Sequence, residues 1–317
     1  MTQNEGEPAI RKSGTAAIVG RPNVGKSTLL NAALRQRLAI VTPTPQTTRD
    51  RILGVVRHSN AQIALIDTPG LHKARSGLGR QMNTMARSAA READVLVFVT
   101  AVPPHPKAPL TPFAPDLTLL GQLDPDTRTV LVINKIDLCR QKTDLLPLLD
   151  AYGKLSSIAA LVPTSALTLD GVGAVLDEVS ALLPERGPAY DEDFLTDRPV
   201  RFFASELIRE QIILSTRDEV PHHVAVEIES FEEAPDIVRI RATIRCAREG
   251  QRGILIGKRG EMLKSIGTVA RIRIEQLLER RVHLELWVTT QQGWIDSQEA
   301  LDALGYLALP SDHGGTP

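Results

Sequence analysis

The chain has 317 residues, 42% of them hydrophobic, and a formal charge of −1 at pH 7. This length predicts about two globular domains of roughly 150 residues each. The nearly neutral total excludes a uniformly basic or acidic chain, although a basic region that faces nucleic acid can be balanced by acids elsewhere.

The cysteines and the N-terminus indicate the compartment. Cys139 and Cys246 are the two cysteines, and they lie far apart without metal-ligand spacing, which argues against a disulfide framework and favours a reducing cytosol. Residues 1–11 lack the apolar stretch of a secretory signal, and no apolar run approaches membrane-spanning length. We expect a cytoplasmic monomer, and peripheral contact with the cytoplasmic face of the cell membrane stays compatible with the sequence.

Short apolar runs alternate with helical segments in the first half of the chain. The expected strands cover residues 16–19, 63–66, 95–99, 130–133 and 158–162. Helices are expected between them, among others at residues 27–38 and 82–92. This alternation predicts an α/β fold with a doubly wound, mostly parallel sheet. A proline-rich stretch at residues 103–115 interrupts the pattern, and we expect it to form a surface loop that touches none of the nucleotide motifs described below.

A second module follows a stretch rich in proline and acidic residues. After it we expect a helix, two strands, a glycine-punctuated turn, a helix and a strand at residues 200–214, 224–230, 237–246, 247–260, 261–280 and 282–288. That order suits a small α+β domain. The predicted boundaries are 12–186 for the first domain, 187–198 for the linker, 199–293 for the second domain and 294–317 for a C-terminal helix and tail, with residues 311–317 disordered.

The strongest local signal is the sequence GRPNVGKS, which follows a predicted strand and opens a helix, as a phosphate-binding loop requires. Glycines let backbone N–H groups surround the phosphates, Lys26 reaches the β- and γ-phosphates, and Ser27 can ligate Mg²⁺. For this loop alone, a chance glycine-rich turn is the alternative. The predicted binding residues are Gly20, Arg21, Pro22, Asn23, Val24, Gly25, Lys26 and Ser27.

Two further motifs, DTPG and NKID, each stand at the end of a predicted strand. In the first, Asp67 can hold a metal through water; in the second, Asp137 can accept hydrogen bonds from the N1–H and 2-amino groups of guanine, which adenine lacks. Either aspartate alone could be a turn residue. The three motifs together, at the ligand-binding edge of an α/β sheet, predict a GTP site. The added contacts are Asp67, Thr68, Pro69, Gly70, Leu71, Asn134, Lys135, Ile136 and Asp137, with Ser165 and Ala166 completing the base pocket.

These motifs, together with QTTR at residues 46–49 and DTPGLH at residues 67–72, resemble the Era family of GTPases. The resemblance implies hydrolysis of GTP to GDP and phosphate. It implies that Lys26, Thr48 and Gly70 are catalytic and that Ser27, Thr48 and Asp67 bind Mg²⁺. Thr47 is the alternative to Thr48 as the switch threonine.

Two positions refine this resemblance. Leu71 stands where Ras-like enzymes carry a water-positioning glutamine, which predicts slow intrinsic hydrolysis unless a partner or second cation completes the site. Asn23 is similar to the asparagine by which related GTPases hold K⁺, with a loop-bracing role as the alternative.

The second module contains GKRG, the pattern with which KH domains clamp a nucleic-acid backbone. Its element order and the sequences FLTDRP, FFASELIRE, HHVAVEIE and VHLELWV resemble the type II KH domain of Era proteins. The predicted RNA contacts are Gly257, Lys258, Arg259, Gly260 and Lys264. For Arg271, Arg273, Arg280 and Arg281, a solvated helix face is the alternative to a basic RNA patch. We expect structural roles for His222 and His223, and a core position for Trp287.

The Era resemblance implies binding near the 3′ end of 16S rRNA and assistance to assembly of the 30S subunit and rRNA maturation. Two other readings stay open. One is a GTPase of another class whose second domain binds protein or cofactor, and the other is a non-enzymatic RNA-binding protein with a structural nucleotide site.

Overall fold

The computed structural model describes residues 10–106, 109–124 and 126–306, and the chain forms two compact units. The first unit contains Met1–Ala39, Thr48–His72 and Met82–Asp197, and the second contains Ile40–Thr47, Lys73–Gln81 and Arg198–Pro317. Two short segments from within the predicted first domain therefore group with the second unit. The predicted disordered tail at residues 311–317 lies outside the described residues.

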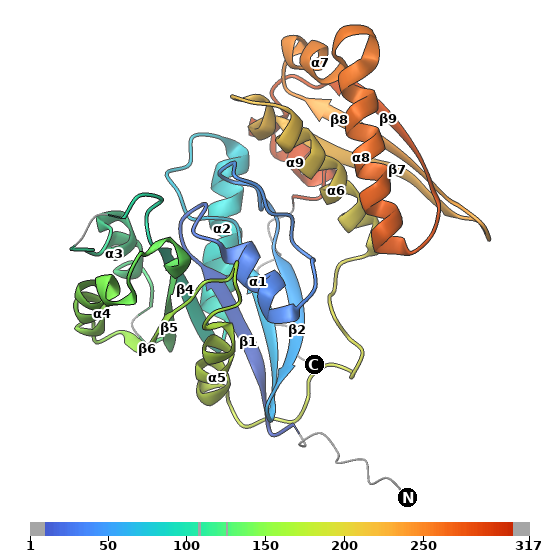
Figure 1. Ribbon diagram of the computed structural model, residues 1–317. Coiled ribbons are helices and arrows are strands. Elements are labelled where there is room, and N and C mark those ends of the chain that lie inside the picture. Colours follow the sequence, from blue (N-terminus) through green and yellow to red (C-terminus); the bar gives the residue numbers. More distant parts are fainter. Residues whose placement is uncertain (1–9, 107–108, 125, 307–317) are drawn as a thin grey trace, which may run out of the picture. The chain divides into compact units, whose positions relative to one another are not determined.

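The first unit is built on a six-stranded sheet in the order β2-β3-β1-β4-β5-β6 (Figure 1). Its strands are β1 (Lys12–Val19), β2 (Ile52–His58), β3 (Ala61–Asp67), β4 (Val95–Ala101), β5 (Thr129–Asn134) and β6 (Ile158–Pro163). All neighbouring pairs are parallel except β2 with β3. This confirms the predicted doubly wound, mostly parallel sheet. Because the strand order reverses at β1, the carboxyl end of β1 lies where such sheets bind ligands.

Helices cover both faces of this sheet. On one face α1 (Lys26–Leu34) packs beside α5 (Val172–Leu182). On the other face α2 (Gly77–Glu92), α3 (Ala114–Leu120) and α4 (Leu146–Gly153) enclose a core with Phe98, Leu131 and Tyr152 at its centre. Two 3₁₀ turns, η1 (Ile136–Leu138) and η2 (Lys142–Leu145), connect β5 to α4. Strands enclosed in this way read as continuous apolar runs, which is why five of the six were predicted from the sequence. The edge strand β2, whose last three residues are only half-buried, was not predicted.

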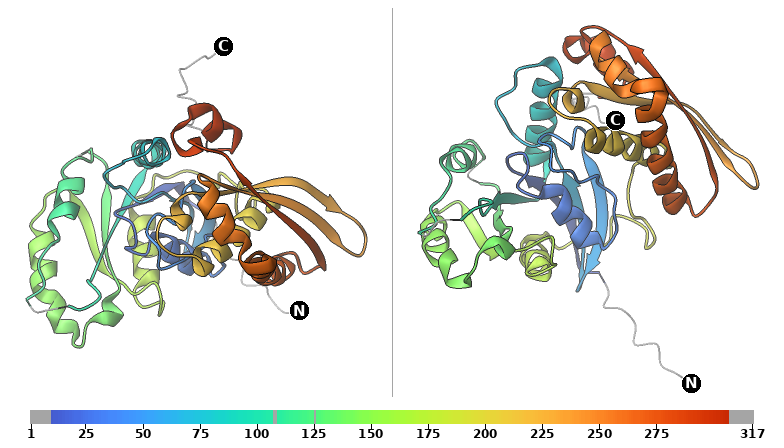
Figure 2. Two further views of the ribbon diagram at one scale, coloured as in Figure 1. Left: turned by 90° about the horizontal axis from the view of Figure 1, so that it is seen from above. Right: turned by 45° about the horizontal axis from the view of Figure 1, so that its top comes forward.

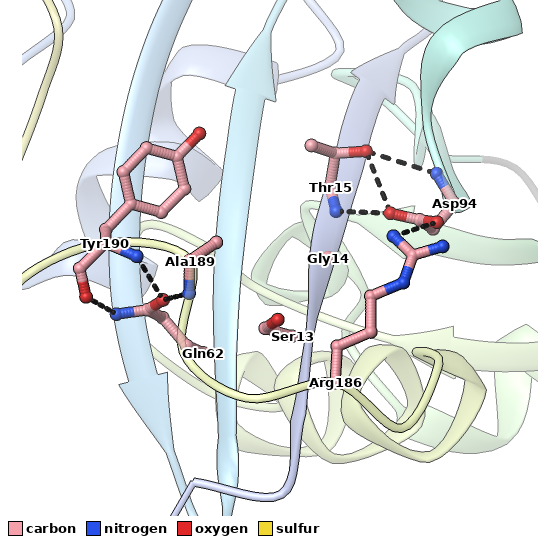
Figure 3. Close-up of a pocket in the computed structure, with 8 residues that line it drawn as sticks. All are labelled: Ser13, Gly14, Thr15, Gln62, Asp94, Arg186, Ala189 and Tyr190. Atoms are coloured by element: carbon pink, nitrogen blue, oxygen red, sulfur yellow. Dashed lines mark hydrogen bonds and ion pairs between the residues drawn. The ribbon is translucent and has the colours of Figure 1, made fainter.

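The predicted linker is partly fixed to the sheet of the first unit (Figure 3). The side-chain oxygen of Gln62 accepts hydrogen bonds from the backbone N–H groups of Ala189 and Tyr190 at 2.8 and 2.9 Å, and its nitrogen donates to the Tyr190 carbonyl at 2.8 Å. Further along, the backbone N–H of Val55 donates to the carbonyl of Leu195 at 2.8 Å. This stretch therefore runs beside the edge strand β2 and its neighbour β3.

The second unit has a three-stranded sheet in the order β7-β8-β9, with β7 and β8 antiparallel and β8 and β9 parallel. Its elements are α6 (Val200–Ser215), η3 (Val220–His222), β7 (Val224–Glu233), β8 (Val238–Cys246), α7 (Glu249–Ile256), η4 (Lys258–Gly260), α8 (Glu261–Leu278), β9 (Val282–Thr290), η5 (Trp294–Asp296) and α9 (Gln298–Ala303). Helices α6 and α8 pack together against one face of the sheet (Figure 2). This is the predicted small α+β domain with one additional helix, α7.

Two local predictions in this unit are wrong. The glycine-punctuated turn contains α7, whose buried Leu255 packs into the core. Trp287 is 49% exposed, because strand alternation places Val282, Leu284 and Leu286 toward the helices and Trp287 on the opposite face.

Two features are absent from the described residues. No helix among them is long and apolar enough to cross a membrane. Nor does any cluster of three or more His, Cys, Asp or Glu side chains within this part of the chain have the arrangement of a metal site.

Candidate nucleotide site and nucleic-acid interface

The loop between β1 and α1 has a conformation that only its glycines permit. Gly20 and Gly25 have φ of 148° and 98°. A Cβ atom on Gly20 would lie 2.3 Å from the carbonyl oxygen of Val99, and one on Gly25 would lie 2.2 Å from the side-chain nitrogen of Asn134. Any larger residue would push the loop away from the sheet, so both glycines are needed for the loop to curl at the helix N-terminus.

Two charged side chains of opposite sign are buried beside this loop. Lys26 donates to the carbonyl of Arg21 at 3.1 Å. Burial lowers the pKa of Lys26 to about 8, although the charge of Asp67 acts in the opposite direction. Burial likewise raises the pKa of Asp67 to about 6, against the stabilising charge of Lys26 and the hydroxyl of Ser27. A polyanion bound here would restore the charged form of Lys26.

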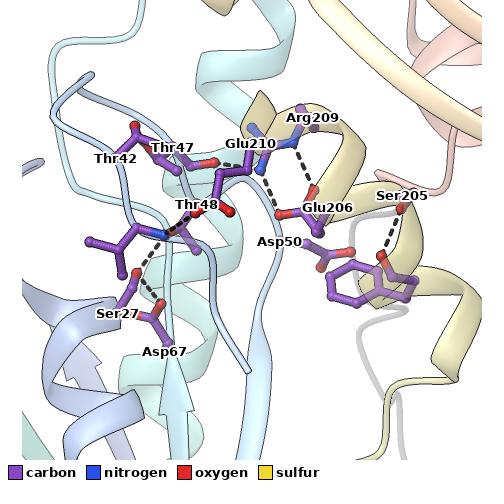
Figure 4. A network of polar contacts seen from close by, with 12 residues as sticks. Ser27, Thr42, Thr47, Thr48, Asp50, Asp67, Ser205, Glu206, Arg209 and Glu210 are labelled. Atoms are coloured by element: carbon purple, nitrogen blue, oxygen red, sulfur yellow. Dashed lines mark hydrogen bonds and ion pairs between the residues drawn. The ribbon is translucent and has the colours of Figure 1, made fainter. Parts of the chain in front are cut away.

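Three oxygen-bearing side chains converge at the start of α1 (Figure 4). The Ser27 hydroxyl donates to Asp67 Oδ2 at 2.6 Å and lies 2.7 Å from the Thr48 hydroxyl. Among the described residues, no hydrogen-bond donor reaches the buried Oδ1 of Asp67. Hard oxygen donors and an unsatisfied carboxylate oxygen fit Mg²⁺. Thr47, the alternative threonine, instead turns its hydroxyl to Thr42 and the Thr44 carbonyl, at 2.6 and 2.7 Å.

The residues after Asp67 pack against the phosphate loop. Thr68 donates to the Ile18 carbonyl at 2.8 Å, and the backbone N–H of Leu71 donates to the Gly20 carbonyl at 3.0 Å. A Cβ on Gly70 would lie 2.6 Å from the backbone nitrogen of Pro22. The side chain of Leu71 is a hydrocarbon and is buried, so it offers no group that could orient a water molecule.

The base end of the site is held by Asn134. Its side-chain nitrogen donates to the Val24 carbonyl at 2.8 Å, and its oxygen accepts from the backbone N–H of Ala166 at 3.0 Å. Asn134 thus ties the phosphate loop to the loop after β6. Asp137 is exposed and accepts a hydrogen bond from Ser165 at 2.6 Å, so the predicted base-reading residues lie together.

The contacts on the side chain of Arg21 were not predicted from the sequence. Asp116, in the first turn of α3, accepts two hydrogen bonds from the Arg21 guanidinium, and the Phe113 ring lies 4.2 Å from its central carbon. The proline-rich stretch at residues 103–115 therefore does touch the phosphate loop, contrary to prediction. The sequence pointed to the helix that carries Asp116 only through a proline and an acidic residue at the helix start.

The GKRG sequence links α7 to α8 through η4. Gly257 and Gly260 have φ of 71° and 82°, and Arg259 between them also has a positive φ of 54°. Lys258, Arg259 and Lys264 are exposed, and none of their side chains hydrogen-bonds or forms an ion pair with any described residue. Other cations of the unit are paired with glutamates, namely Arg241, Arg245, Arg252, Arg271 and Arg280.

Comparison with known proteins decides the family. A family model described as 50S ribosome-binding GTPase matches residues 15–135, and one described as KH domain matches residues 219–295. GTPase Era of Ruminiclostridium cellulolyticum is 43% identical over 297 residues, covering 93% of this chain and 97% of that protein. GTPase Era of Geobacter metallireducens is 45% identical over 299 residues, covering 93% and 98%. The chain belongs to the Era family of GTPases.

Solved Era structures share the fold. Era in complex with MgGDPNP and nucleotides 1506–1542 of 16S ribosomal RNA is 36% identical, with a TM-score of 0.89, covering 94% of this chain and 100% of that one. A variant of Aquifex aeolicus Era bound to GDP and AlF4⁻ is 36% identical, with a TM-score of 0.88. As an Era-type enzyme, the chain binds GTP and hydrolyses it to GDP and phosphate.

Proposed function

We propose that this Era-type GTPase is a switch that binds 16S rRNA near its 3′ end through the GKRG loop and assists maturation of the 30S ribosomal subunit. The observation that carries the RNA half is a pair of cations, Lys258 and Arg259, whose side chains have no partner among the described residues and which lie between two glycines that let a backbone approach. The similar Era structure with bound 16S rRNA supplies the class of RNA.

The nucleotide half of the proposal assigns roles to individual residues. Lys26 neutralises the β- and γ-phosphates, and the Gly70 backbone N–H faces the γ-phosphate. Ser27 and Thr48 would hold Mg²⁺ directly, with Asp67 holding it through water. When bound, Mg²⁺ offsets the charge that develops on the transferring phosphoryl group. Asp137 reads guanine, and Ser165 orients its carboxylate.

Leu71 leaves the attacking water without a side-chain partner, which supports slow intrinsic hydrolysis. We propose that K⁺ beside Asn23 offsets charge during hydrolysis. Asn23 has a left-handed backbone with φ of 62°, and its carbonyl accepts from the Lys135 ammonium at 2.6 Å, so a bracing role competes with this proposal. Equal hydrolysis rates in KCl and NaCl would leave bracing alone.

The test of the RNA half is binding to a short RNA that copies the 3′ end of 16S rRNA, with a scrambled RNA for comparison, in GDP and in a non-hydrolysable GTP analogue. We expect selective binding that strengthens with the GTP analogue. The double variant Lys258→Ala with Arg259→Ala should weaken RNA binding at least tenfold, because about two contacts to RNA phosphates are lost. It should leave GTP affinity unchanged.

A matched control is the double variant Arg241→Ala with Arg271→Ala. It removes the same charge from the same unit, but each of these arginines is paired with a glutamate. It should therefore change RNA affinity much less. If both double variants weaken binding equally, the basic surface is generic; if neither does, the RNA half of the proposal is wrong.

A further inference from the structure

The side chain of Arg21 in the phosphate loop is held on one side by a carboxylate and on the other by an aromatic ring. Its Nε and Nη2 donate to Oδ1 and Oδ2 of Asp116 at 2.5 and 3.1 Å. This two-point geometry fixes a guanidinium more firmly than a single contact does. The Phe113 ring lies against the guanidinium while its own side chain stays 51% exposed.

Asp116 is an unusual acid because it is 0% exposed. Burying a carboxylate is costly unless charge and hydrogen bonds compensate it. Here the Thr100 hydroxyl, at the end of β4, adds a third hydrogen bond to Oδ2 at 2.6 Å. Apart from that hydroxyl, Arg21 is the group that makes the burial of Asp116 tolerable. The burial of Asp116 therefore favours the paired arrangement of Arg21.

Arg21 stands between two points at which the start of the phosphate loop packs against neighbouring segments. Its predecessor Gly20 packs on the Val99 carbonyl, and its successor Pro22 packs on Gly70. The carbonyl of Arg21 itself accepts the hydrogen bond from Lys26, the phosphate-binding lysine. A restraint on the Arg21 side chain thus restrains the carbonyl that orients Lys26 and the loop next to Gly70.

We propose that Asp116 is a positioning residue of the nucleotide site, acting through the guanidinium of Arg21 to fix the first turn of the phosphate loop. Phe113 covers the pair and completes the clamp. No motif of the nucleotide site includes Asp116, Phe113 or Thr100. The restraint lowers the conformational entropy that the phosphate loop loses when nucleotide binds, so removing the restraint should speed nucleotide release.

The test is a double-mutant cycle on the full chain, read out as the dissociation rate of a fluorescent GDP analogue. Asp116→Ala and Arg21→Ala should each accelerate dissociation by about tenfold, a usual size for coupling between sites. If Asp116 acts through Arg21, the double variant should release the analogue no faster than either single variant. A merely structural role for Asp116 would make the two accelerations multiply, and that result would overturn the proposal.

The remaining variants separate positioning from folding. If circular dichroism shows that Asp116→Ala lowers the folded fraction, Asp116→Asn takes its place in the cycle, because the amide keeps the side-chain volume and one hydrogen-bond acceptor. Asp116→Asn should accelerate release of the analogue less than Asp116→Ala does. This acceleration should also vanish in the Arg21→Ala background. Phe113→Leu should accelerate release by about threefold through loss of the cation–π contact. Asp150→Asn, which breaks an exposed ion pair with Lys154, is the matched control and should change nothing. Release within about twofold of wild type in folded Asp116 variants would also refute the proposal.

Discussion

Asp137 is the residue that we propose selects the base. Its carboxylate offers two acceptors, and guanine offers the matching N1–H and 2-amino donors. In Asp137→Asn, one acceptor becomes a donor that faces the 2-amino group, so a charge-assisted bond of roughly 1.5–3 kcal/mol is lost. We expect GTP affinity to fall by about 10- to 150-fold and affinity for xanthosine triphosphate, which has a carbonyl at that position, to rise. Fluorescence competition with the two nucleotides measures both; unchanged selectivity would contradict the assignment.

Which individual residues could be predicted from sequence depended on whether their role was local. Lys26, Ser27 and Asp67 stand at fixed places in motifs, and the structure brings all three together. The choice between Thr47 and Thr48 was open, because the side chains of adjacent loop residues point in different directions. The conformation of the folded loop decides which of the two faces the site. Asp116 was beyond prediction, since its partner is 95 residues away along the chain.

At the scale of elements, α7 shows why a turn was predicted where a helix forms. Its sequence, EGQRGILI, has two glycines, which disfavour helix. The helix is fixed instead by Gln251, whose side-chain oxygen accepts from the backbone N–H groups of Ala247 and Arg248 at 3.1 and 3.0 Å. The strands and long helices were predictable because their apolar periodicity is a property of the segment itself.

This makes Gln251 the residue on which α7 depends. Gln251→Ala would leave the backbone N–H of Arg248 without its acceptor, whereas that of Ala247 keeps the carbonyl of His223 at 3.2 Å, and we expect a loss of about 1 kcal/mol in the free energy of unfolding of the second unit. Urea denaturation followed by circular dichroism measures it. Arg252→Ala, at the next and exposed position, should cost less than about 0.5 kcal/mol. Equal losses in the two variants would show that the capping bonds do not hold the helix.

At the scale of the whole molecule, residues 40–47 belong to the second unit although they lie within the first domain's sequence. Buried Arg209 on α6 donates to the carbonyl of Thr47 at 2.6 Å and is oriented by Glu206 at 2.7 and 2.6 Å (Figure 4). The next residue along the chain is Thr48, whose hydroxyl meets Ser27 in the first unit. One peptide bond therefore joins a residue held by the RNA-binding unit to a proposed Mg²⁺ ligand.

This connection predicts that Arg209 carries nucleotide state to RNA affinity. Arg209→Met keeps the length and apolar packing of the side chain but loses the bond to Thr47, so the ratio of RNA dissociation constants in GDP and in the GTP analogue should fall toward one, by up to about tenfold. RNA affinity in GDP should stay close to wild type, since the GKRG loop is untouched. Arg201→Met, exposed on the same helix, should keep the full ratio. A folded Arg209→Met protein with an unchanged ratio would show that the switch signal reaches the RNA-binding unit by another route.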